Sequence, residues 1–202
     1  MRIVEFLKKD FKIFYRKKTV FVLPIVFSFV SAIVISFFVQ RASYELMWIV
    51  FLFASVYPQI EIMRSEFEDD VIESLITSPV SSGDIFISKF LFGFIFLSIV
   101  GFFTIIFFVF FTNLQVSTSL LFSFAISLVG IVSLSTLFSL FAVSEDISFP
   151  AYYVIVFPFY IPVIISSVKF VEGDSFALRL ILGFDIINFF ASYALFDIRK
   201  LQ

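Results

Sequence analysis

The sequence predicts an all-α integral membrane protein with about six transmembrane helices. Of its 202 residues, 61% are hydrophobic and only 15% are charged, whereas a soluble domain is about 45–50% apolar and about 25% charged. A helix needs about 20 mostly apolar residues to cross the bilayer and satisfies its own backbone groups there. A membrane β-barrel would instead show short alternating segments, but runs such as 102–111 are continuously apolar.

Six segments reach or approach the length of a transmembrane helix, and we expect them to form one membrane domain over residues 1–202. They are 20–39, 46–63, 90–111, 120–143, 149–168 and 178–196.

The basic residues indicate the orientation of these spans. If the N-terminus is cytoplasmic, Arg41, Lys169 and Arg179 lie outside and the rest of the 14 basic residues lie inside. The inside set is Arg2, Lys8, Lys9, Lys12, Arg16, Lys17, Lys18, Arg64, Lys89, Arg199 and Lys200. Because positive charge favours the cytoplasmic side, we expect both termini to be cytoplasmic.

Residues 1–18 form an amphipathic pattern at 100° per residue. The basic side holds Arg2, Lys8, Lys9, Lys12 and Arg16, and the other side holds Ile3, Val4, Phe6, Leu7, Phe11, Ile13, Phe14 and Tyr15. This predicts an elbow helix that lies in the membrane plane with its apolar face down. The alternative is a basic anchor that only orients the first span.

The longest hydrophilic stretch is the predicted cytoplasmic loop at 64–84. A short helix there has an acidic face of Glu66, Asp69, Asp70 and Glu73, opposite an apolar face of Phe67, Val71, Ile72, Leu75 and Ile76. Pro79 ends this helix, and Ser81 with Asp84 forms an approximate capping box for the next one. Alternatively, this loop is a solvated acidic segment that only connects the second and third spans.

Glu68 falls in the middle of the apolar face of the loop helix. A carboxylate there is costly unless a cation meets it. We hypothesise that Glu68 pairs with a basic residue of the elbow helix or of a partner protein.

The loop resembles that of ABC-2-type permeases, most closely the CcmB family, the haem exporter B subunits of cytochrome c maturation. The family pattern, approximately E-x-E-x-G-x-L-E-x-L-x-x-x-P followed by a lysine, is matched by Glu66, Glu68, Glu73, Leu75, Pro79 and Lys89. Asp70 and Ile72 stand where the family has glycine and leucine. Residues 6–29, 157–167 and 182–197 are also similar to that family.

The resemblance implies a transporter permease, not an enzyme, whose loop helix docks on a separate ABC ATPase subunit. None of the six glycines begins a G-x-x-x-x-G-K-[ST] phosphate loop, so ATP would bind the partner chain. The implied setting is the bacterial inner membrane, with a permease homodimer, a haem-handling membrane subunit and a haem chaperone as partners, and no nucleic acid. The chain lacks His and Cys, the usual axial ligands of haem, so we expect it to bind no cofactor directly.

Two other functions fit the same pattern. One is an ABC-2-type permease for another amphipathic substrate, such as a lipid, a polysaccharide or a drug. The other is a non-transporting membrane scaffold that anchors an ATPase.

Four residues inside the predicted spans are further candidates. Asp185 and Asn188 share one face of the sixth span, where an ionisable residue is a functional candidate, although Asp185 could instead reach the interface or Arg179. Pro158 and Pro162 should break or bend the fifth span near the outer leaflet. The resemblance implies an outer re-entrant gate at 160–177, and the alternative is a kink without a gating role.

Overall fold

The computed structural model describes residues 7–12, 17–39, 42–68 and 81–196, with the backbone alone at 65–68. Six of its helices are long and apolar enough to cross a membrane, which confirms the all-α fold and the six spans. They are α2 (Lys18–Phe38), α3 (Tyr44–Glu68), α5 (Ser82–Thr112), α6 (Thr118–Ser144), α7 (Phe149–Val171) and α8 (Ser175–Leu195).

Several helices extend beyond the predicted spans because local capping continues them. The side chain of Ser81 accepts a hydrogen bond from the Asp84 N–H at 3.1 Å, so α5 begins with the predicted cap. Asp174 caps α8 in the same way through the N–H of Phe176. Helix α3 also extends beyond its predicted span: it continues past residue 63 to Glu68.

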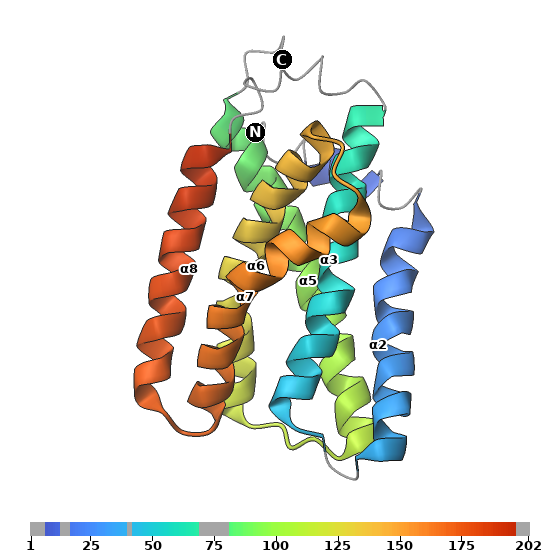
Figure 1. Cartoon of the computed structure of the whole chain (residues 1–202), viewed down its shortest axis with the longest axis vertical. Helices are drawn as coiled ribbons and strands as arrows, with labels where there is room; N and C mark the ends of the chain where they lie inside the picture. Colours follow the sequence, from blue (N-terminus) through green and yellow to red (C-terminus); the bar gives the residue numbers. More distant parts are fainter. Residues whose placement is uncertain (1–6, 13–16, 40–41, 69–80, 197–202) are drawn as a thin grey trace.

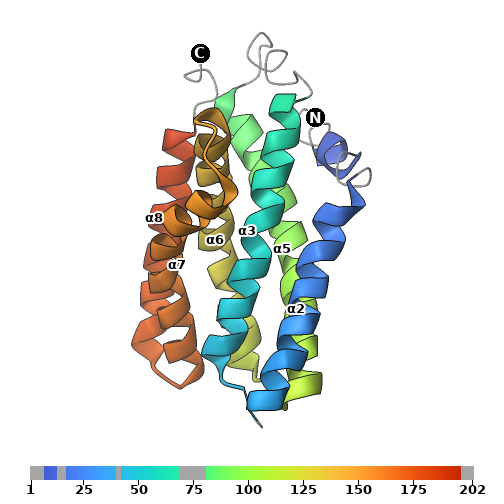
Figure 2. The ribbon, with the colours of Figure 1, turned by 45° about the vertical axis from the view of Figure 1, so that its right-hand side comes forward.

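The helices form one bundle in which α6 is central (Figures 1 and 2). It packs against α3, α5, α7 and α8, while α2 packs against α3 and α5 at one edge. The most apolar stretches of α3 and α6 are mostly buried, whereas those of α2 and α8 are mostly exposed. Outward apolar side chains are expected where helices face lipid, because lipid tails are as apolar as leucine.

Helix α7 is bent but not broken. Pro158 and Pro162 lie inside it, and Figure 1 shows α7 running obliquely across the bundle before turning along it. A proline bends a helix where it removes a backbone hydrogen bond. Both prolines lie in the middle part of the helix, which continues to Val171, and a short turn with Gly173 at φ 105° leads into α8. Residues 160–177 therefore do not form the re-entrant segment that we expected.

Candidate functional site

The short helical segment at residues 7–12, the described part of the elbow, lies beside the bundle end where α3 finishes and α5 begins (Figure 2). Lys8 and Lys12 are exposed, whereas Leu7 packs against the core. Phe11 is partly exposed and contacts Phe92 of α5 edge to face, with ring centroids 5.1 Å apart. Leu7, Lys8 and Lys12 thus lie as the helical wheel predicted, whereas Phe11, from the predicted apolar side, is 43% exposed.

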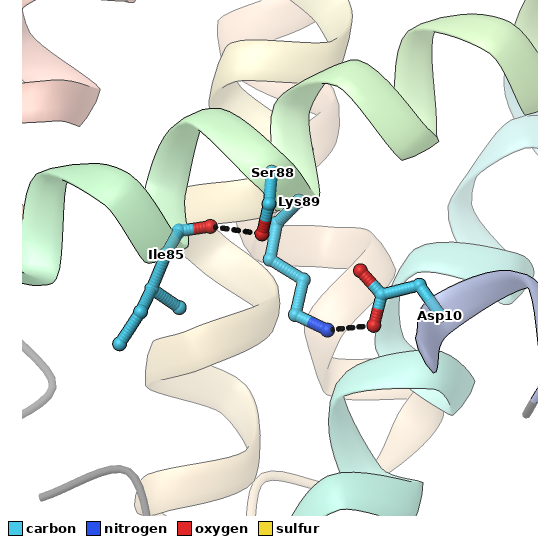
Figure 3. Close-up of polar contacts among 4 residues, drawn as sticks. All are labelled: Asp10, Ile85, Ser88 and Lys89. Atoms are coloured by element: carbon cyan, nitrogen blue, oxygen red, sulfur yellow. Dashed lines mark hydrogen bonds and ion pairs between the residues drawn. The ribbon is translucent and has the colours of Figure 1, made fainter. Parts of the chain in front are cut away.

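Asp10 departs from that pattern because it is buried against α5. Its carboxylate Oδ1 lies 2.5 Å from Lys89 Nζ, and the two side chains are only 1% and 7% exposed. Figure 3 shows Lys89 reaching out from α5 to Asp10, while the neighbouring Ser88 hydroxyl donates to the Ile85 carbonyl of its own helix. Removing one member of such a buried pair leaves an uncompensated charge. Lys89 thus lies within α5, where it holds the elbow.

A second ion pair joins the elbow end to α3. Lys17, the residue before α2, places its Nζ 3.2 Å from Glu61 Oε1, and both side chains are partly exposed. Residues 7–12 are therefore tied to α5 through Lys89, and Lys17 is tied to α3 through Glu61. These are the two helices that the loop connects.

Most predicted loop residues lie outside the part of the chain that the structure describes. Asp69, Asp70, Glu73, Leu75 and Pro79 are in the segment 69–80. Glu66 and Glu68 are described by their backbone only, as the last residues of α3. The loop helix and the pairing of Glu68 therefore stay predictions, but the helix that contains Glu66 is continuous with the second span.

Asp185 and Asn188 lie together at the contact between α8 and α6. Asp185 is 3% exposed, and a Cβ added to Gly130 of α6 would lie 2.1 Å from its Oδ1 and 3.5 Å from Asn188 Nδ2. Both carboxylate oxygens of Asp185 are enclosed by the chain, and Oδ1 lies against the backbone of Gly130. Arg179 is exposed and makes no ion pair with Asp185. Since α8 begins at Ser175, Asp185 is about 15 Å along the helix.

The sequence analysis missed three residues of these contacts: Asp10, Glu61 and Gly130. Asp10 follows Leu7 by three residues and so falls beside the apolar side of the elbow. Like Glu68, Asp10 is a carboxylate among apolar residues of an amphipathic helix, so the same pattern could have identified it. No local pattern identifies Glu61 or Gly130, because their partners come from distant segments.

A family model described as CcmB protein matches residues 1–195. No curated protein and no solved structure matches the chain. The match covers nearly the whole length and all six described spans. The chain therefore belongs to the CcmB family, the membrane component of the ABC-type haem-export system of cytochrome c maturation.

Proposed function

We propose that ATP hydrolysis on a separate subunit drives this permease through the loop at 64–84, and that the elbow holds the two ends of that loop together. The ATPase would dock on the acidic face of the loop. The resulting movement would pass into α3 and α5 and serve haem export or the release of a haem-loaded chaperone.

The observation that supports this proposal is the double attachment of the elbow. The buried Asp10–Lys89 pair connects it to the start of α5, and the Lys17–Glu61 pair connects it to the end of α3. Because a force applied at the loop enters both helices, a segment that bridges them would make them move together. A flexible basic anchor that only orients the first span would not need a buried ion pair.

The charge distribution supports a cytoplasmic location for this end of the bundle. The elbow, the start of α2, the end of α3 and the start of α5 carry most of the described basic residues, whereas Lys169 and Arg179 lie near the turn between α7 and α8. This distribution supports, through the positive-inside rule, our proposal that the elbow lies in the cytoplasm. The ATPase would meet the chain there.

Haem would be handled mainly by partners. The chain has no His and no Cys, so an axial ligand would come from another membrane subunit. A permease homodimer together with two ATPase subunits is the assembly that we propose.

The test is ATPase activity in nanodiscs that contain this chain and its ATPase. We expect the double variant Asp69→Lys/Asp70→Lys to lower the stimulated rate several-fold, because it reverses the charge of the docking face. Asp10→Asn should lower it without changing the loop. Glu172→Lys, at the other end of the bundle, is the matched control and should leave the rate unchanged.

Two results would contradict the proposal. If the loop variant stimulates the ATPase as well as the unchanged chain does, coupling through the loop is wrong and the scaffold role is favoured. If Glu68→Gln leaves assembly and activity unchanged, the proposed pairing of Glu68 is wrong.

A further inference from the structure

The outward face of the elbow is basic. Leu7 packs against the core and Asp10 is buried against α5, so one side of the elbow is turned toward the bundle. Lys8 and Lys12 lie four residues apart on one helical face, and both are exposed. Phe11 lies between the two sides, because its ring touches α5 and yet is 43% exposed. The outward face thus carries two ammonium groups beside part of an aromatic ring.

The length of α2 places this face at the level of the lipid headgroups. The helix runs from Lys18 to Phe38, which is about 30 Å, and a bilayer has a hydrocarbon core of about 30 Å. Its first strongly exposed apolar side chains are Val22 and Leu23, at 50% and 53%. Lys18 is exposed one turn before them, so it lies near one boundary of the hydrocarbon. The elbow directly precedes that boundary in the chain.

Helix α5 gives the same level independently. From Lys89 it continues to Thr112, a length of about 35 Å that is sufficient to cross the hydrocarbon core. Lys89 therefore lies at the edge of the membrane and not in its middle. Since its ammonium pairs with Asp10, the elbow is fixed against α5 at the depth where lipid phosphates lie.

An anion is the partner that this face would recognise. Like charges four residues apart on a helix destabilise it, and an anion between Lys8 and Lys12 would remove their repulsion. Basic segments next to a span are attracted to acidic phospholipids, and lysine stems can lie along apolar surface while their ammonium groups reach the polar boundary. The exposed part of Phe11 suits the same depth, since aromatic side chains are common on interfacial helices.

We propose that the outward face of the elbow binds the headgroup phosphates of acidic phospholipids through Lys8 and Lys12, and that these lipids help to hold the elbow against α5. The Asp10–Lys89 pair secures the inner side, and the lipids secure the outer side. Figure 2 shows the elbow outside the bundle beside the start of α2, where lipid headgroups have access. This interaction goes beyond the proposed function, because it requires neither the loop nor the ATPase.

The experiment compares the full chain in nanodiscs of phosphatidylcholine with the same chain in nanodiscs that also contain phosphatidylglycerol, at equal ionic strength. Hydrogen exchange of the amides at residues 7–12 reports how firmly the elbow is held. We expect exchange to be about tenfold slower in the acidic nanodiscs, as two lysines at an acidic membrane surface predict. Inorganic phosphate added to the neutral nanodiscs should not slow it.

Paired variants then test the two ammonium groups. The double variant Lys8→Gln/Lys12→Gln keeps a similar helix propensity but should exchange equally fast in both lipids. Lys8→Arg/Lys12→Arg keeps the charges and should retain the slowing. Lys169→Gln/Arg179→Gln removes two exposed basic residues near the other end of the bundle and should leave the lipid effect at residues 7–12 unchanged.

Four outcomes would overturn the inference. They are equal exchange of the unchanged chain in both lipids, a lipid effect that survives Lys8→Gln/Lys12→Gln, faster exchange of that variant by the same factor in both lipids, and equal slowing by inorganic phosphate. The third would show that the lysines bind acidic groups of the protein, and the fourth would show a site for soluble anions. Because no outcome depends on ATP hydrolysis, failure here would leave the proposed coupling untouched.

Discussion

Among the described residues, the buried carboxylates Asp10 and Asp185 differ in what they face. Asp10 is 1% exposed in the elbow and meets Lys89 from a helix 79 residues away in sequence. Asp185 is similarly buried in α8, yet it faces the backbone of Gly130 and an apolar groove. The first carboxylate forms an ion pair with a distant side chain, whereas the second packs against the backbone of a neighbouring helix.

This difference shows how a membrane permease can use costly groups for two purposes. A buried pair fixes geometry, because either member alone is strongly unfavourable. Changing each group separately should therefore affect different properties: attachment of the elbow for Asp10, and packing of α8 on α6 for Asp185.

The largest effect is expected at Asp10, the carboxylate that forms a buried ion pair. Asp10→Asn keeps the shape but removes the carboxylate charge that faces the buried Lys89 ammonium. We expect the opening free energy of the elbow to fall by about 3–5 kcal/mol. Hydrogen exchange of the amides at residues 7–12 in detergent or nanodiscs would measure it.

A charge swap tests whether the pair itself is responsible. Asp10→Lys with Lys89→Asp should recover part of the protection that either single change removes, since double-mutant cycles isolate the interaction. Lys169→Met, which removes an exposed pair with Glu172, is the control and should change little. Equal protection in Asp10→Asn and the unchanged chain would show that the pair does not hold the elbow.

The second largest effect concerns the close approach at Asp185. Gly130→Ala adds a Cβ that would lie 2.1 Å from Asp185 Oδ1, and overpacking of this kind costs about 1–3 kcal/mol. We expect a lower free energy of unfolding in denaturing detergent. Combining Gly130→Ala with Asp185→Ala should remove most of the loss.

Gly183 of α8 provides the matched control. A Cβ there meets nothing within 4 Å, so Gly183→Ala should stabilise the protein by up to about 1 kcal/mol through helix propensity alone. If the two alanine substitutions had the same effect, Asp185 would not be tightly packed against α6.

The sequence predicts the spans well because apolar length is a local property. It also predicts the start of α5, because the signal of Ser81 and Asp84 lies within one helical turn. It does not predict that α3 and α6 are interior while α2 and α8 are at the edge, since all four are strongly apolar. The Asp10–Lys89 and Gly130–Asp185 contacts depend on how distant helices align, which no periodicity encodes.

A smaller effect is expected at Ser81, the N-cap of the helix that contains Lys89. Ser81→Ala removes the acceptor for the Asp84 N–H and should lower stability by about 1 kcal/mol. The first turn of α5 should exchange its amide hydrogens faster, while Lys89, two turns further on, should keep its pair. Ser117→Ala removes the equivalent cap of α6 and is the comparison. If Ser81→Ala released the elbow as fully as Asp10→Asn does, the buried pair would depend on the cap, and the contrast between the two carboxylates would weaken.

The smallest effect is expected at the second contact of the elbow. The Lys17 and Glu61 side chains are 35% and 23% exposed, so Lys17→Met should change the opening free energy of residues 7–12 by only about 0–1 kcal/mol. Salt makes the comparison sharper, because it screens exposed pairs more than buried ones. Raising the ionic strength should therefore abolish the difference between Lys17→Met and the unchanged chain, while the difference caused by Asp10→Asn persists. If salt weakened both differences equally, the environment of Asp10 would be open to water, and the elbow would be held by ordinary surface charges instead of by a buried pair.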